Sequence, residues 1–204
     1  ALYEWAGAVG ASPFRLTDLS ALDARTPAAL LVLQPESPID PAASAAFDAV
    51  PRTAGTLIVA GDSLAWLLYV RSLGVTVDPI RDAQSNLSTP DGALSIGAPY
   101  RFRLTADGAT PLLVAPNGDW VALRMPYERG SLVVLATAAP LTNAGLADPQ
   151  TARFVYRDVL RSILSAPGAL AFDEAHHSFV PSAVGPTSLN QLAFDTPAGR
   201  ALLY

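Results

Sequence analysis

The side chains best suited to chemistry gather in one short stretch near the end of the chain, Asp173-Glu174-Ala175-His176-His177. It holds both histidines of the sequence, next to two carboxylates. Histidine and carboxylate groups act together in general acid–base catalysis and also bind metal ions. The stretch follows the apolar run from Ala169 to Phe172, which predicts a buried strand. Ligands of open parallel sheets bind beyond the carboxyl ends of the strands, so this stretch is the first candidate site.

Two other polar stretches follow predicted strands in the same way. They are Gly61-Asp62-Ser63, after the run from Thr56 to Ala60, and Thr142-Asn143, after the run from Ser131 to Ala136. We therefore expect a site at the carboxyl edge of a sheet. The candidate ligand-binding residues are Thr142, Asn143, Asp173, Glu174, His176 and His177.

Three interpretations of the histidine stretch compete. A metal site would use histidine and carboxylate ligands, but the spacing matches neither H-E-x-x-H nor its inverse, and adjacent side chains of an extended segment point in opposite directions. A purely structural role would have Asp173 and Glu174 accept backbone N–H groups and the histidines hold the loop. We favour no metal and no cofactor.

The third interpretation is a hydrolase, either a serine esterase or a metal-assisted hydrolase. Gly61-Asp62-Ser63-Leu64 resembles the nucleophile block of the GDSL esterases, and Asp173-x-x-His176 resembles their Asp-x-x-His block. In that alternative Ser63 would attack, His176 would be the base and Asp173 would orient it. The glycine and Gly-x-Asn-Asp blocks that build the oxyanion hole of that family are missing, and Ser63 also suits a helix N-cap. We therefore favour no catalytic residue.

Composition excludes several classes of function. The 204 residues carry a net charge of −5, and all 13 basic residues are arginine, so no Schiff-base or P-loop lysine exists. The chain has no cysteine, which excludes thiol nucleophiles and thiolate metal sites. We expect no nucleic-acid partner, because the sequence shows no basic patch. We interpret Arg124 and Arg129 as solvated.

The order of the predicted elements favours an α/β fold. Strands at 29–33 and 56–60 alternate with helices at about 41–50 and 64–73, and the pattern resumes with a strand at 131–136, a helix at about 151–164 and a strand at 169–172. Residues 76–125 predict an antiparallel insertion or edge region. We expect one α/β domain over 1–204, a three-layer sandwich with a mostly parallel sheet.

An ordered series of motifs resembles an uncharacterised bacterial family, the domain-of-unknown-function 4350 family. The motifs are a glycine-led strand at Gly130, a Thr-Asn loop at Thr142-Asn143, a helix start near Asp148 and the closing Phe172-Asp173-Glu174-Ala175-His176-His177. The usual Asn after Asp148 and the usual Gly after His177 are absent, since Pro149 and Ser178 stand there. The likeness covers nearly the whole chain.

This resemblance implies a membrane-anchored module with a transmembrane helix before and after it. It also implies a flavodoxin-like fold, similar to class I glutamine amidotransferases without their catalytic Cys, and an extracytoplasmic role in binding or assembly. The resemblance does not point to an enzymatic activity. Residues 181–204 would lead to a membrane anchor. The expected partners are other membrane or envelope proteins, or a small ligand. The final residues, from Thr196 to Tyr204, have the form of a helix that enters a bilayer, so we expect the two termini on one side of the fold.

The histidine stretch also gives an expectation about protonation. A nearby carboxylate favours imidazolium, whereas burial opposes it. We predict that at least one of His176 and His177 bonds to a carboxylate of this stretch and has a raised pKa.

Overall fold

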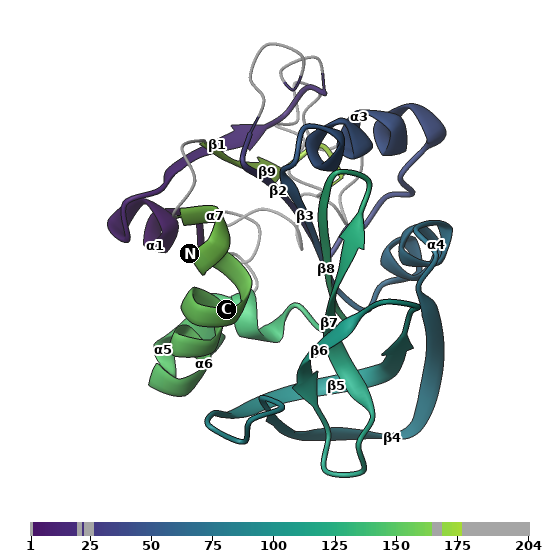
Figure 1. Ribbon diagram of the computed structural model, residues 1–204, viewed down its shortest axis with the longest axis vertical. Coiled ribbons are helices and arrows are strands. Elements are labelled where there is room, and N and C mark those ends of the chain that lie inside the picture. Colours follow the sequence, from purple (N-terminus) through teal and green to yellow (C-terminus); the bar gives the residue numbers. More distant parts are fainter. Residues whose placement is uncertain (1, 20–21, 23–26, 165–168, 177–204) are drawn as a thin grey trace, which may run out of the picture.

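A single sheet organises the protein in the computed structural model, which describes residues 2–19, 22, 27–164 and 169–176. Within these residues the sheet has nine strands in the order β1-β9-β2-β3-β8-β7-β6-β4-β5 (Figure 1). The five strands from one edge to the middle are β1 (Ser12–Leu16), β9 (Ala169–Asp173), β2 (Ala29–Leu33), β3 (Thr56–Ala60) and β8 (Gly130–Leu135). The other four are β7 (Trp120–Tyr127), β6 (Thr110–Val114), β4 (Thr76–Ser88) and β5 (Ser95–Thr105).

The sheet changes character at β8. From β1 to β8 all neighbours are parallel, with Leu31 opposite Ile58 and Ile58 opposite Val133. From β8 to β5 all neighbours are antiparallel. The four apolar runs predicted as strands, which form β2, β3, β8 and β9, therefore pair in parallel. A strand that is buried on both faces needs other elements on both sides of the sheet, and the helices that connect parallel strands provide this cover.

The predicted fold class is nevertheless wrong. The two longest strands, β4 with 13 residues and β5 with 11, are antiparallel, whereas β1, β2, β3 and β9 have five residues each. The sheet is thus mixed and mostly antiparallel, not a flavodoxin-like or class I glutamine amidotransferase-like parallel sandwich. The physical reason is that β5 alternates exposed and buried residues. It is a half-solvated strand among turn-forming residues, and such strands lack the continuous apolar run that marks a central strand.

Helices cover both faces of the parallel half (Figure 1). On one side lie α3 (Pro41–Arg52) and α4 (Leu64–Ser72). On the other side lie α1 (Leu2–Ala8), α5 (Asn143–Ala147), α6 (Pro149–Phe154), the π-helical turn η2 (Val155–Leu160) and α7 (Arg161–Leu164). None of the helices in the described ranges is long and apolar enough to cross a membrane.

Short polar side chains begin these helices where strands end. Asp40 accepts the N–H of Ala43 at 2.8 Å and starts α3, and Ser63 accepts the N–H of Trp66 at 3.1 Å and starts α4. Such N-caps satisfy donors that have no partner inside the helix. The loops that leave β2 and β3 are consequently short and held at the carboxyl edge of the sheet.

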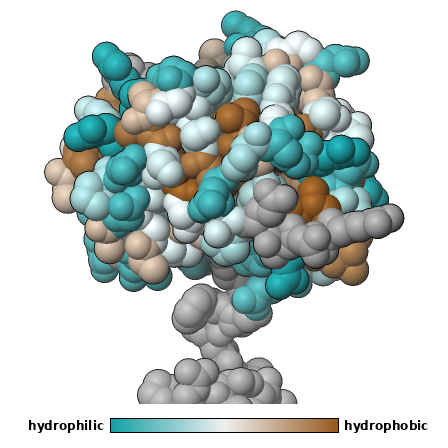
Figure 2. Space-filling view, turned by 90° about the horizontal axis from the view of Figure 1, so that it is seen from below, coloured by the Kyte–Doolittle hydropathy of each residue, from teal (hydrophilic) through white to brown (hydrophobic). Residues whose placement is uncertain are grey.

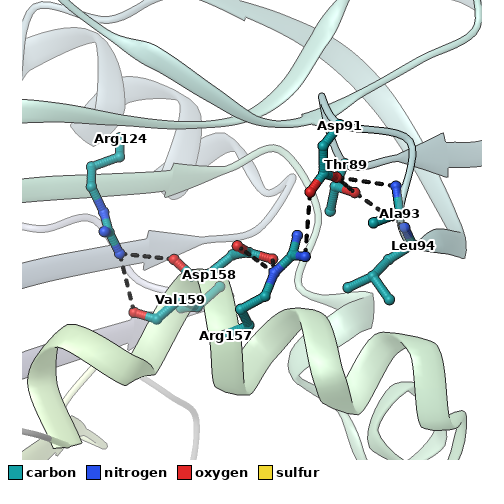
Figure 3. Close-up of polar contacts among 8 residues, drawn as sticks. All are labelled: Thr89, Asp91, Ala93, Leu94, Arg124, Arg157, Asp158 and Val159. Atoms are coloured by element: carbon teal, nitrogen blue, oxygen red, sulfur yellow. Dashed lines mark hydrogen bonds and ion pairs between the residues drawn. The ribbon is translucent and has the colours of Figure 1, made fainter.

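Arg124 links strand β7 to the helical turn η2. It is therefore not the solvated residue that we predicted from the sequence. From β7 its Nη2 donates to the carbonyl oxygens of Asp158 at 2.8 Å and Val159 at 3.4 Å, both in η2 (Figure 3). Burial lowers the pKa of Arg124, while the charge of Asp158 partly offsets this. The guanidinium therefore binds two backbone carbonyl oxygens of the π-helical turn. In an α-helix these carbonyl groups would have a different hydrogen-bond pattern.

The same helical turn is tied to the β4–β5 connection. Nε of Arg157 lies 2.9 Å from Oδ1 of Asp158, and its Nη1 lies 3.4 Å from Oδ2 of Asp91 (Figure 3). Asp91 in turn accepts hydrogen bonds from Thr89 and Ala93.

In Figure 2, the outer surface of the molecule seen from below shows apolar patches separated by polar residues.

Candidate functional site

The centre of the candidate site is a buried pair formed by Asp173 and His176. Asp173 ends β9, and Nδ1 of His176 lies 2.9 Å from Oδ2 and 3.1 Å from Oδ1 of its carboxylate. Asp173 is 2% exposed and His176 is 8% exposed. The N–H of Ala175 donates to the same carboxylate at 3.1 Å. Residues 173–176 therefore form a tight turn in which the last side chain, His176, contacts the carboxylate of the first residue, Asp173.

His176 joins the end of β9 to the loop between β2 and α3. Its carbonyl oxygen accepts the N–H groups of Glu36 at 2.9 Å and Ser37 at 3.3 Å. Its ring packs edge-on against Phe47 of α3, with ring centroids 5.5 Å apart. The residue thus holds three elements together through its backbone, its ring nitrogen and its ring face.

The protonation of His176 follows from this environment. The hydrogen bond with Asp173 raises the pKa of His176, burial opposes the rise, and the charges of Asp173 and Asp40 add to it. The expected hydrogen bond to a carboxylate and the expected direction of the shift are therefore confirmed for His176. His177 lies outside the described residues, so the same expectation is untested there.

Gln34 connects the ends of β2 and β3, and it was not among the predicted site residues. Its Nε2 donates to Oδ1 of Asp62 at 2.9 Å, and its Oε1 accepts the N–H of Asp62 at 3.1 Å. Gln34 has a φ of 45°, in the left-handed region. The only hint in the sequence is its position before Pro35, where a buried strand must stop.

Ser63 is occupied by structural contacts. Its hydroxyl donates to the carbonyl oxygen of Pro35 at 2.6 Å and accepts the N–H of Trp66. Within the described part of the chain no hydrogen bond joins Ser63 to His176. The arrangement is that of an N-cap, and it lacks the serine–histidine contact of a nucleophilic dyad.

Glu174 lies on the outer side of this edge. Its N–H donates to the carbonyl oxygen of Leu16 at 3.0 Å, at the end of β1. Its carboxylate lies 3.9 Å from Nε of Arg15, whose guanidinium carbon is 5.1 Å from the centre of the Tyr3 ring. Glu174 therefore extends the polar edge toward β1.

Thr142 and Asn143 do not join this group. They follow β8, and β8 is separated from β9 by β2 and β3 in the sheet order. Three strand spacings amount to roughly 14 Å. Thr142 caps α5 by accepting the N–H of Gly145 at 3.1 Å, and Asn143 is the exposed first residue of that helix. The predicted set thus divides into two places along one sheet edge.

The residues described here contain no group of three or more histidine, aspartate and glutamate side chains that could hold a metal ion. The metal interpretation would need ligands beyond Asp173 and His176.

A groove between α3 and α4 opens beside the Asp173–His176 pair, and the sequence did not predict it. We call it the α3–α4 groove. Its volume is about 360 Å³, and its lining comes from the start of α3 and one face of α4. The lining residues are Pro38, Ile39, Asp40, Pro41, Ser44, Ala65, Leu68, Tyr69 and Ser72.

Tyr69 forms part of this groove and is almost fully buried. Burial strongly raises the pKa of its hydroxyl, and the charges of Asp48 and Tyr127 raise it further. The interaction with the Ser44 side chain lowers the pKa and partly offsets this rise. Among the residues that the structure describes, no group satisfies hydrogen-bond geometry with this hydroxyl. It is therefore a neutral phenol at physiological pH.

Comparisons with solved structures show the fold alone. The mmIFT52 N-terminal domain is similar with a TM-score of 0.55 and 10% identity, over 74% of this chain and 82% of that one. Cytoplasmic Protein STM1381 from Salmonella typhimurium LT2 is similar with a TM-score of 0.51 and 17% identity, over 72% and 75%. Another match, the exo-β-1,4-mannosidase Op5Man5 from Opitutaceae bacterium strain TAV5, has a TM-score of 0.39 and 16% identity over 61% of this chain. The chain spans only 24% of that mannosidase.

The sequence comparisons are more specific. No curated protein sequence matches the chain. One family model matches residues 1–157, from α1 into η2, and these residues make up most of the chain. The match ends before β9, so it does not include Asp173 and His176. By that match the chain belongs to the family described as Domain of unknown function (DUF4350).

Proposed function

We propose that the chain is a non-catalytic, extracytoplasmic binding domain of a membrane-anchored protein. Its partner is another membrane or envelope protein, or a small ligand, recognised at the carboxyl edge of the parallel strands. One observation carries the proposal: the polar side chains at this edge are used to fix the loops. Asp173 holds His176, Gln34 holds Asp62, and Ser63 holds Pro35.

A site that transfers a proton or an acyl group needs an activated nucleophile next to a base. The hydroxyl proton of Ser63 is directed to a carbonyl oxygen, away from such a role. A rigid edge with fixed loops suits recognition, because little order is lost when a partner binds. Glu174 and the exposed Ala175 present the outer part of this edge.

Photo-crosslinking in the full-length protein tests this proposal. A crosslinking amino acid replaces Ala175, which is exposed at the edge, and in a control it replaces Asp107, which is exposed in the turn between β5 and β6. We expect a discrete crosslinked product from position 175 in cells and none from position 107. Identical patterns from both positions, or no product from position 175, would contradict binding of a protein partner at this edge.

The location is tested separately. We expect the full-length protein in the membrane fraction. Protease added to spheroplasts should degrade this domain, whereas a cytoplasmic marker protein in the same unlysed spheroplasts should remain intact. Recovery in the soluble cytosolic fraction would contradict an extracytoplasmic, anchored domain.

A further inference from the structure

The α3–α4 groove differs from the rest of the described surface in its exposed apolar side chains. Three large apolar residues in the described ranges are classed as exposed: Leu64 at 70%, Leu68 at 55% and Tyr156 at 46%. Leu64 and Leu68 are one turn apart on α4, and Leu68 lines the groove. Residues four apart on a helix lie side by side. They form an apolar ridge along one wall of the groove.

The lining of the groove is apolar and largely preformed. Ile39, Ala65 and the two prolines that flank Asp40 supply apolar surface, and the N-caps Asp40 and Ser63 fix the starts of the two helices. Large exposed apolar side chains next to a hollow are typical of protein interaction sites. A groove between two helices can accept an amphipathic helix whose apolar residues recur every three or four positions.

The charged residue among those that line the groove is acidic. Asp40 is exposed and lines the groove, and Asp62 is exposed next to the start of α4. The basic residue on α4, Arg71, donates to the carbonyl oxygen of Val77 at 2.9 Å, and Arg52 at the far end of α3 lies 3.9 Å from Asp48 and 3.7 Å from Glu128. The chain as a whole has no lysine and a net charge of −5. Such a field favours a basic partner.

From the ridge, the groove and the acidic rim we infer that the α3–α4 groove binds an amphipathic helical segment of a partner protein, with leucine-like residues on one face and lysine or arginine beside them. The apolar face packs on Leu64 and Leu68, and a side chain enters the groove beside Tyr69. The basic residues lie next to Asp40 and Asp62. This inference rests on the proposed binding function and names the partner's chemistry at a surface next to the polar edge.

A defined probe peptide tests the inference on the purified chain. The probe is a synthetic amphipathic peptide of about 14 residues with leucines on one face and lysines elsewhere, long enough to fold when bound. We expect saturable binding, with NMR shift changes confined to residues 38–44 and 64–72. Substitution Leu68→Gln should weaken binding about tenfold, as is usual for a central apolar contact. Tyr156→Gln, at the other exposed site, should leave it unchanged.

The charge contribution has its own matched pair. Asp40→Asn removes the charge but keeps an N-cap residue, and it should weaken binding of the lysine probe about threefold at low salt. Asp107→Asn removes the same charge far from the groove and should have no effect. A probe with glutamate in place of lysine should bind at least about tenfold more weakly.

Several outcomes would overturn the inference. These are no saturable binding, equal binding of the lysine and glutamate probes, shift changes outside the groove, or Leu68→Gln binding like the native chain. Self-association that increases with concentration and is abolished by Leu68→Gln would assign the groove to a second copy instead. Crosslinking from position 175 does not depend on the groove, so it can succeed while the groove fails, and the two proposals are judged separately.

Discussion

Asp173 and His176 have side chains suited to chemistry, and both take part in holding a turn. Each carries a group that chemistry could use, but the carboxylate accepts from the imidazole and from the N–H of Ala175. A buried carboxylate needs such partners, because an unpaired charge in the interior is costly. At this position the first task of the pair is to hold the turn after β9.

The first prediction concerns the pH dependence of that pair. Because the folded pKa of His176 is raised, the extra stability from its protonated form is fully present below the unfolded pKa of about 6.5 and is lost as pH rises through the folded pKa. We expect the difference in unfolding free energy between the native chain and His176→Gln to be largest near pH 5.5 and to shrink toward pH 9. Urea unfolding across this range measures it.

Asp173→Asn is the matched test of the cause. It keeps the size of the side chain but removes the charge, so the pKa of His176 should fall in an NMR titration. The substitution should also cost about 1–3 kcal/mol, the usual range for a buried charged hydrogen bond. A His176 midpoint that does not move would show that Asp173 is not the source of the shift.

The second prediction separates the two interpretations of Ser63. As an N-cap, its replacement by alanine should cost about 1 kcal/mol, whereas Ser63→Asp should retain most of the stability because aspartate also caps helices. Hydrolysis of a short-chain acyl ester should be the same for the native chain, Ser63→Ala and Ser63→Asp. Ester hydrolysis that is lost in both variants would restore the hydrolase interpretation.

At the scale of elements, the π-helical turn η2 is held from two sides. Arg124 binds its carbonyl oxygens from β7, and Arg157 reaches Asp91 in the β4–β5 connection (Figure 3). Both contacts join the antiparallel half of the sheet to the helices that cover the parallel half. The turn is therefore a point where the two halves are connected.

The third prediction is that Arg124→Met weakens this connection. The side chain keeps its apolar stem but loses two hydrogen bonds to η2, so stability should fall by about 1–2 kcal/mol, reduced by the partial exposure of the group. Hydrogen exchange should become faster in residues 155–160 and stay unchanged in α3. Unchanged exchange in η2 would contradict a role for Arg124 in holding it.

The fourth prediction concerns the approach of β8 to the segment before β3. A Cβ at Gly130 would collide with the backbone carbonyl of Gly55, whereas a Cβ at Gly97 in β5 would meet no atom within 4 Å. Backbone cannot move aside as a flexible side chain can, so Gly130→Ala should destabilise the protein by roughly 1–3 kcal/mol. Gly97→Ala should be close to neutral in the same thermal unfolding experiment. Equal melting temperatures would show that β8 can shift away from Gly55.

At the scale of the whole molecule, one hydrophobic core runs through both halves of the sheet. The buried cluster includes Leu31 and Ile58 in the parallel half and Ile96 and Leu123 in the antiparallel half. β8 takes part in both ladders, with Val133 opposite Ile58 on one side and Arg124 on the other. The two halves share a strand and therefore should not unfold independently.

The fifth prediction follows from that shared strand. The three tryptophans report on separate regions, with Trp5 on α1, Trp66 buried on α4 and Trp120 on β7. In variants that keep one tryptophan each, fluorescence should give coincident urea midpoints that also match far-UV circular dichroism, as two-state unfolding requires. A separate, lower midpoint for Trp120 would reveal an antiparallel half that unfolds alone.

Much of the parallel half could be predicted from the sequence alone. The runs at 29–33, 57–60 and 169–172 are apolar throughout, which is typical of a strand covered on both faces. The start of α4 was predicted from Ser63, because N-capping depends on the residue and its nearest neighbours. The contact between His176 and a carboxylate was also predicted, since the two residues are only three positions apart in the chain.

The tertiary structure alone decided the rest. An antiparallel region was predicted at 76–125, but the length of its β4–β5 ladder, which carries register shifts and makes the sheet mostly antiparallel, was not. Thr142 and Asp173 were grouped because both follow strands, but the order of the strands in the sheet separates them by roughly 14 Å. The role of Gln34, the burial of Arg124 and the α3–α4 groove each depend on residues far apart in the chain. Local patterns fix where a strand or a helix cap forms, whereas the neighbours of that element are chosen by packing across the whole molecule.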